Sequence, residues 1–146
     1  MSYPLIDDSD NHPLAIVVET VASSLLRAHP APICLEVDID HDIRSPVDAP
    51  SLCQLLDSVI RQALLEMSDG GELTITGCQT TTGVEIELAD TGRDVESRAC
   101  KLPMIAAAMS ADVRWQNCPQ GGGAVTVCIP FYRQRSADQQ RNRRAA

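Results

Sequence analysis

The residues of this chain that could do chemistry lie in one amphipathic segment and two glycine-containing turns. Ser58 and Gln62, in "LLDSVIRQALLEM", are four residues apart, so on a helix they share one face, away from the neighbouring leucines. Their hydroxyl and amide groups can donate and accept hydrogen bonds. The other candidates are Asp90 and Gly92 in "VEIELADTGRD" and Gly122 and Gly123 in "QGGG". Taken alone, "DTG" is typical of a turn that ends a strand, and "QGGG" of a flexible hairpin turn.

The cysteines and histidines do not form a recognisable metal site. No two of the six cysteines have CxxC spacing, and most lie in apolar runs such as "PICLEV" and "VTVCIP". We therefore expect reduced thiols in or near the core of a cytoplasmic protein. The N-terminal "MSYPLIDDSDNHP" does not resemble a secretory signal. No run of about 18 apolar residues indicates a membrane span.

Composition predicts one folded domain between two polar ends. The chain has 146 residues, 44% of them hydrophobic but only 3% aromatic, so one aliphatic core is expected. The net charge of −8 argues against nucleic acid as a partner. From residue 133 onward, five arginines and one aspartate give +4, which leaves −12 for the rest. We predict a flexible N-terminus over 1–11, a domain over 12–132 and a basic, disordered tail over 133–146.

Apolar periodicity defines the elements that must position these residues. Period-3.6 patterns predict one helix in "PLAIVVETVASSLLRAH", residues 13–29, and a second over 50–67, and "KLPMIAAAMSA" predicts a short third one. Alternating patterns predict strands in "PICLEVDI", "ELTITGC", "GVEIELA", "DVRWQ" and "AVTVCIP". Helices mixed with largely antiparallel strands predict an α+β fold, a two-layer α/β sandwich with the helices on one face of the sheet.

The order of three segments resembles a known family. "LCQLLDSVIRQALLEMSDGGELTIT", then "VEIELADTG", then "GGGAVTVCIP" resemble the catalytic ATP-binding domain of sensor histidine kinases, of the GHKL superfamily with its Bergerat fold. The resemblance covers about residues 12–131. It implies that the polar face of the second helix carries an amide ligand of Mg²⁺, here at Gln62 with Ser58 one turn earlier. It also implies that Asp90 and Gly92 contact adenine, and that Gly122 and Gly123 belong to the last glycine motif.

The chain departs from that family at the residues nearest the phosphates. Gln62 stands where the family has Asn, and Mg²⁺ demands near-ideal octahedral geometry at about 2.1 Å. Asp94 replaces the second glycine of the adenine motif, which places a negative charge near a polyanion. The family's long lid and its glycine-rich phosphate cradle are reduced to "DVESRACKLP". Pro103 has no N–H to offer at the start of the next helix. We therefore predict a vestigial site with no catalytic residue, no metal unless Gln62 holds Mg²⁺, and no cofactor unless ATP and Mg²⁺ still fit.

Three functions remain open from the sequence. The favoured one is a histidine kinase-like protein of bacterial two-component signal transduction that lacks ATP hydrolysis and kinase activity and acts as an interaction or regulatory module. The alternative is a divergent ATP-binding domain, of an anti-sigma type or a separate kinase catalytic domain, that phosphorylates a partner protein. The third is an assembly protein. None of the three histidines lies in an amphipathic helix beside an acidic residue, so the chain is not expected to be a complete histidine kinase.

Loss of the lid predicts an exposed apolar surface for a partner. Methionine adapts to irregular surfaces, and contiguous exposed apolar groups mark interaction sites. A signalling protein or a second copy of the chain is expected to dock there, helped by arginines of the tail. The candidate residues are Met104, Ile105, Ala108, Met109, Arg133 and Arg135. We expect the partner to be neither a nucleic acid nor a membrane.

Overall fold

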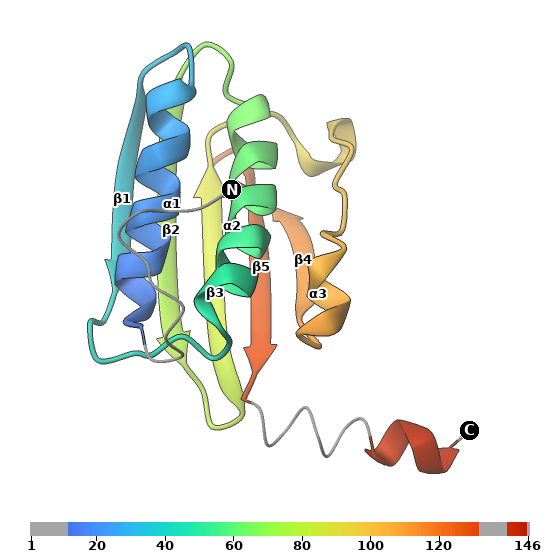
Figure 1. Cartoon of the computed structure of the whole chain (residues 1–146). Coiled ribbons are helices and arrows are strands. Elements are labelled where there is room, and N and C mark those ends of the chain that lie inside the picture. The colour runs from blue at the N-terminus through green and yellow to red at the C-terminus, as the bar shows by residue number, and fades with distance from the viewer. Residues whose placement is uncertain (1–11, 132–139, 146) are drawn as a thin grey trace.

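The computed structural model describes residues 12–131 and 140–145, in which the strands form one five-stranded sheet (Figure 1). The strands are β1 (Ile33–Ile39), β2 (Gly71–Gln79), β3 (Gly83–Asp90), β4 (Asp112–Asn117) and β5 (Gly123–Pro130). Their order across the sheet is β1-β2-β3-β5-β4. Only β1 and β2 pair in parallel, and the other three pairs are antiparallel. The predicted, mostly antiparallel sheet is confirmed.

The helices pack on one face of this sheet. They are α1 (Leu14–Ala28), α2 (Ala49–Leu65) and α3 (Ile105–Ala108), with a 3₁₀ turn, η1, at Val95–Ser97. Helices α1 and α2 lie side by side over the sheet, and α3 contacts α2 near the β4 edge (Figure 1). The two-layer α+β sandwich is therefore as predicted. Among the described residues, no helix has the length and apolarity needed to cross a bilayer.

The core lies between α2 and the central strands. Leu55, Leu56, Val59 and Ile60 are at most 2% exposed, as the periodicity of α2 predicted. They face strand residues that are fully buried: Leu73, Ile75, Ile86 and Leu88. Each such aliphatic side chain contributes about 1.5–3 kcal/mol on full burial. This core fixes α2 against the end of β3, and both carry site residues.

The ends of α2 follow standard capping chemistry. The Asp48 carboxylate accepts a hydrogen bond from the Ser51 N–H at 3.0 Å, and Pro50 occupies the first turn. After Leu65 the chain turns through Gly70, whose φ of 102° favours glycine. The helix is two residues shorter at its C-terminal end than the predicted 50–67, because its last residues form turns. Gln62 therefore lies in the last turn of α2, beside the end of β3.

The opposite face of the sheet is polar, which corrects the expectation for two cysteines. Strand residues alternate between faces, so Cys34 and Cys78 point away from the helices and are exposed. The prediction that the thiols lie in or near the core is wrong for these two. Cys53 on α2 is buried, and its burial raises the pKa of the thiol. Cys53 therefore behaves as the predicted core thiol.

The two ends of the chain lie largely outside the described residues. This applies to the predicted flexible segment 1–11 and to residues 132–139 of the tail, including Arg133 and Arg135. Residues 140–145 are helical with every side chain exposed, where the sequence predicted disorder. Local helix propensity in "QRNRRA" gives a simple reason, since Gln, Arg and Ala are good helix formers.

Candidate functional site

The candidate site is organised around Asp90, the last residue of β3. This carboxylate is buried, at 5% exposure for the whole residue. Its Oδ1 accepts hydrogen bonds from the N–H groups of Gly92 at 2.9 Å and Gly123 at 3.3 Å. A buried carboxylate also needs a compensating charge. That charge is supplied by Arg98.

Arg98 binds Asp90 through both ends of its guanidinium. Nη1 lies 2.7 Å from Oδ2 and Nη2 lies 2.6 Å from Oδ1. The two side chains are only 7% and 3% exposed. Arg98 also donates from Nε and Nη2 to the Arg93 carbonyl, at 2.9 and 2.6 Å. The hydrogen bond to Asp90 raises the pKa of Arg98, so a bidentate, charged pair fills this end of the site.

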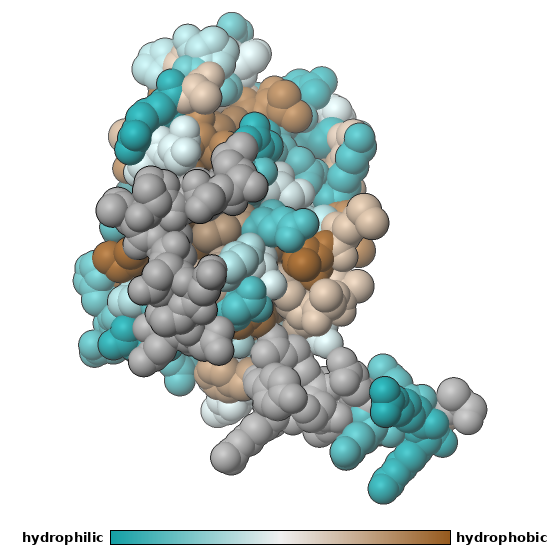
Figure 2. Space-filling model, in the orientation of Figure 1, coloured by the Kyte–Doolittle hydropathy of each residue, from teal (hydrophilic) through white to brown (hydrophobic). Residues whose placement is uncertain are grey.

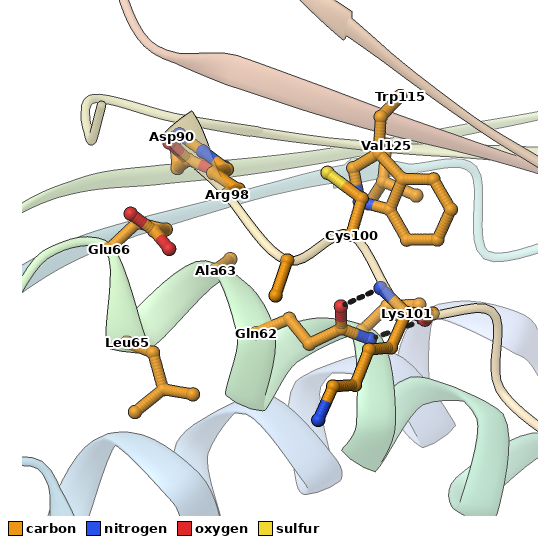
Figure 3. A pocket seen from close by; sticks show the side chains of 12 residues that line it. Gln62, Ala63, Leu65, Glu66, Asp90, Arg98, Cys100, Lys101, Trp115 and Val125 are labelled. Atoms are coloured by element: carbon orange, nitrogen blue, oxygen red, sulfur yellow. Dashed lines mark hydrogen bonds and ion pairs between the residues drawn. The ribbon is translucent and has the colours of Figure 1, made fainter. Parts of the chain in front are cut away.

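Gln62 is bound to the chain segment that carries Arg98. Its Nε2 donates to the Lys101 carbonyl and its Oε1 accepts from the Lys101 N–H, both at 2.9 Å (Figure 3). Nε2 also lies 3.5 Å from Ser58 Oγ, so these two residues share one face of α2 as predicted. The side-chain amide pairs with the backbone much as a neighbouring strand would. Its donor and acceptor atoms are both engaged.

The segment over the site, residues 93–103, is called the strap below. It has five attachments to the body. Two are the Arg98–Asp90 and Lys101–Gln62 contacts already described. In the third, the Asn117 Oδ1 accepts from the Val95 N–H at 2.8 Å, and in the fourth, Arg93 Nε lies 2.8 Å from a Glu66 carboxylate oxygen. In the fifth, Asn117 Nδ2 donates to both oxygens of the Glu96 carboxylate, at 3.0 and 2.9 Å. The strap therefore closes over the space between α2 and the ends of β3 and β5.

The remaining space beneath the strap is small. A cavity of about 150 Å³ lies between α2, the strap and the sheet (Figure 3). Its apolar walls include Val59, Ala63, Trp115 and Val125, with Cys100 on the strap side. Pockets for ligands of drug size measure about 300–1,000 Å³. The space left by the strap is smaller than that range.

Gly122 and Gly123 pack so closely against Asp90 and Arg98 that neither position has room for a side chain. Gly122 has φ of 87°, and a Cβ there would collide with the Asp90 carbonyl oxygen. At Gly123 a Cβ would lie 2.8 Å from Arg98 Cζ. The predicted hairpin turn between β4 and β5 is also present, with the Cys118 N–H bonded to the Gly122 carbonyl at 3.0 Å. The turn therefore has a second role in making room for the arginine.

The structure separates the residues predicted to bind a partner. Met104 is 96% exposed and Ala108 is exposed, whereas Ile105 is half-buried. Met109 is 3% exposed and belongs to the core. Its prediction as a surface residue is wrong, because in this four-residue helix Ala106 and Met109, three apart, face inward. The surface over α3 is mostly brown in Figure 2.

Metal ligands are not gathered in the described part of the chain. There, no group of three or more His, Cys, Asp or Glu side chains could hold a metal ion. Gln62, the one expected contact to Mg²⁺, has its amide oxygen bonded to the Lys101 N–H. Asp94, the predicted source of repulsion, is exposed at the start of η1.

The fold defined by these elements is that of a histidine kinase-type ATPase domain. The chain superposes on Acinetobacter baumannii histidine kinase AdeS with a TM-score of 0.67 at 18% identity, covering 84% of this chain and 66% of AdeS. It superposes on mycobacterial sensor histidine kinase MprB with a TM-score of 0.64 at 15% identity, covering 82% of this chain and 95% of the MprB chain. It superposes on the histidine kinase domain of the Erythrobacter litoralis blue-light activated kinase with a TM-score of 0.66 at 19% identity, covering 89% of this chain and 68% of that domain. The chain thus spans just under two thirds of AdeS.

Sequence comparison adds no relative to these structural ones. No protein-family model and no curated protein matches the chain. TM-scores of 0.64–0.67 establish a shared fold, and because the identities are only 15–19%, the residues of the site must be judged on their own contacts.

Sequence reasoning missed the strap residues Arg98 and Lys101, and Asn117 of β4, which binds the strap. The segment "DVESRACKLP" was interpreted only as a shortened lid. One signal was available: the segment that follows Asp90, an aspartate expected at the end of a buried strand, carries the cations Arg93, Arg98 and Lys101. A buried acid requires a partner.

Proposed function

We propose that this chain is a histidine kinase-like protein of bacterial signal transduction that does not bind ATP, has neither ATPase nor kinase activity, and acts as an interaction or regulatory module. The fold relates it to the catalytic domains of sensor kinases. The proposal of lost nucleotide binding rests mainly on one observation, the bidentate Arg98–Asp90 pair. It occupies the carboxylate that the family resemblance assigns to adenine.

The second polar contact expected for a nucleotide is occupied too. The Gln62 amide is paired with the Lys101 backbone on both its atoms. A nucleotide would have to displace two sets of hydrogen bonds and enlarge a cavity of about 150 Å³. The residues as they stand do not fit ATP or its Mg²⁺, so we assign them no step of phosphoryl transfer.

The phosphate side supports the same proposal. Backbone N–H groups at a helix N-terminus commonly bind phosphate. Here the approach to α3 passes through Pro103, which has no N–H, and α3 has only four residues. Asp94 and Glu96 set exposed negative charge on the strap beside the exposed cations Arg93 and Lys101, of which Arg93 is already paired with Glu66. This side therefore does not offer a polyanion the free N–H groups of a helix N-terminus.

We further propose that the module works in the cytoplasm by binding a signalling protein or a second copy of itself. The exposed apolar groups Leu65, Leu102 and Met104, at 76%, 61% and 96% exposure, support a protein contact on the α2, strap and α3 side. Tail arginines Arg133 and Arg135 remain candidates for the same contact. The acidic body argues against nucleic acid.

Isothermal titration of the full chain with Mg²⁺-ATP tests the proposal. We expect no saturable heat, or a Kd no tighter than about 1 mM. The Asp90→Asn variant is the control, because it removes the charge of the carboxylate while keeping an acceptor for the two glycine N–H groups. A micromolar Kd that Asp90→Asn weakens would instead support the alternative, a divergent ATP-binding domain that phosphorylates a partner.

A further inference from the structure

We propose that the Asp90 site is a recognition site for a planar guanidinium, and that Arg98 is the tethered ligand that fills it in the closed protein. This inference rests on the proposed function, since it takes the site to be free of nucleotide. It adds the chemical class of the group that the site accepts.

The Asp90 carboxylate, which is the charged part of the receptor side, is held in place without the strap; only the Arg93 carbonyl oxygen comes from the strap itself. Asp90 is held by the N–H groups of Gly92 and Gly123, and these residues follow β3 and open β5. The carboxylate therefore keeps its orientation whether or not Arg98 is present. Close packing of Gly92 against α2 fixes the same corner, because a Cβ there would lie 2.6 Å from Glu66 Cβ.

The acceptor atoms around Arg98 make the site selective for a guanidinium. The polar atoms that Arg98 contacts are all acceptors: both Asp90 oxygens and the Arg93 carbonyl oxygen. A guanidinium has only donors, set in a planar fork that matches a carboxylate. A primary ammonium has the charge without the fork. A neutral amide or a carboxylate would present an acceptor or a negative charge to these oxygens.

The space around the Arg98 side chain has the size of a small alkylguanidine. The strap reaches the site with a single long side chain, and the Arg98 guanidinium lies against Gly123 with no room for a Cβ there. The adjoining cavity, walled by Val59, Ala63, Trp115 and Val125, accommodates a small apolar group next to the charged one. Truncating Arg98 leaves a slot that matches a guanidine carrying a short alkyl chain.

Chemical rescue tests this inference. Arg98→Ala lacks the part of the side chain that N-ethylguanidine supplies, and its thermal unfolding is measured with 0–50 mM of that probe. We expect Tm to rise with the logarithm of the probe concentration above Kd, by about 3–5 °C at a tenfold excess over Kd. The wild-type protein should show no such rise, because its tethered guanidinium has a high effective concentration. Ethylammonium at the same ionic strength should give less than half the rise.

The double variant Arg98→Ala/Asp90→Asn is the matched control, and it should not respond to N-ethylguanidine. If Arg98→Ala is unfolded without the probe, the readout becomes the recovery of its helical circular dichroism on adding N-ethylguanidine. An unresponsive Arg98→Ala, or equal responses in the single and double variants, would overturn the inference. Failure of the proposed function would be seen separately, as Mg²⁺-ATP binding to the wild-type chain.

Discussion

Asp90 and Arg98 form two nearly parallel hydrogen bonds of 2.6 and 2.7 Å, with both side chains at most 7% exposed. One residue ends a central strand and the other belongs to an irregular segment. Their pairing therefore joins the strap to the core at the carboxylate that the sequence analysis assigned to a nucleotide. The energetic consequences of that pairing can be measured.

Removing the cation alone should be costly. Arg98→Met leaves a buried carboxylate without a counter-charge, and breaking such a pair costs about 3–5 kcal/mol of unfolding free energy. Arg98→Met/Asp90→Asn should recover most of that loss, because the double variant buries no charge. Urea unfolding gives the values. Arg93→Met, which breaks an ion pair in which Arg93 is 65% exposed, should cost much less, because water screens an exposed pair. Equal losses for Arg93 and Arg98 would contradict this account.

Gly123→Ala should destabilise the protein through Arg98. The added Cβ would lie 2.8 Å from Arg98 Cζ, and crowding of this kind costs about 1–3 kcal/mol. In an Arg98→Ala background the same change should cost less than about 0.5 kcal/mol, because the crowded group is gone. Unfolding free energies of the four proteins form a double-mutant cycle. Additive effects would mean that Gly123 serves only the turn.

The fold was predictable because its signals are periodic. The leucine stripe of α2 and the alternation of the strands each repeat over many residues, so single exceptions do not obscure them. They gave the two-layer sandwich and the shared face of Ser58 and Gln62. The site was less accessible. Arg98 lies in a segment without periodicity, and its contact with Asp90 exists only once β3 and the strap are placed together.

Met109 shows the same limit on a smaller scale. Four helical residues do not define a face in the sequence, so Met104 and Met109 both looked like surface groups. The packed structure puts one outside and the other in the core. The cysteines of the outer sheet face were misjudged for a different reason: Cys34 alternates with the apolar Ile33 and Leu35, which places it on the polar face of its strand, but it was judged by the apolar run around it.

The same substitution should destabilise the protein at Met109 and leave its stability almost unchanged at Met104. Met109→Gln places an amide in the core, and an unsatisfied buried polar group costs about 1–3 kcal/mol before packing losses. Met104→Gln changes a side chain that is 96% exposed and should shift the unfolding free energy by less than about 0.5 kcal/mol. Thermal unfolding of the two variants compares them directly. A stable Met109→Gln would place α3 differently from the structure described above.

Glu96 on the strap should titrate below the usual range of a glutamate. Both of its carboxylate oxygens accept from Asn117 Nδ2, at 3.0 and 2.9 Å, and this hydrogen bond lowers the pKa of Glu96 from its ordinary value of 4.5. A depressed pKa in the folded state adds stability that is fully present above the unfolded-state pKa. That contribution is lost as the pH falls through the folded-state pKa. The attachment of η1 to Asn117 should therefore weaken in acid.

Substitution of Asn117 tests whether its hydrogen bond is what lowers the pKa of Glu96. Asn117→Ala should return the pKa of Glu96 toward 4.5, as followed by NMR titration of its side-chain carboxyl. Asn117→Asp retains an acceptor for the Val95 N–H but sets a second negative charge beside Glu96, so it should raise that pKa above the value in Asn117→Ala. The order expected is wild type lowest, Asn117→Ala next and Asn117→Asp highest. If Asn117→Ala left the pKa unchanged, the hydrogen bond would not be its cause, and Asn117 would hold the strap through Val95 alone.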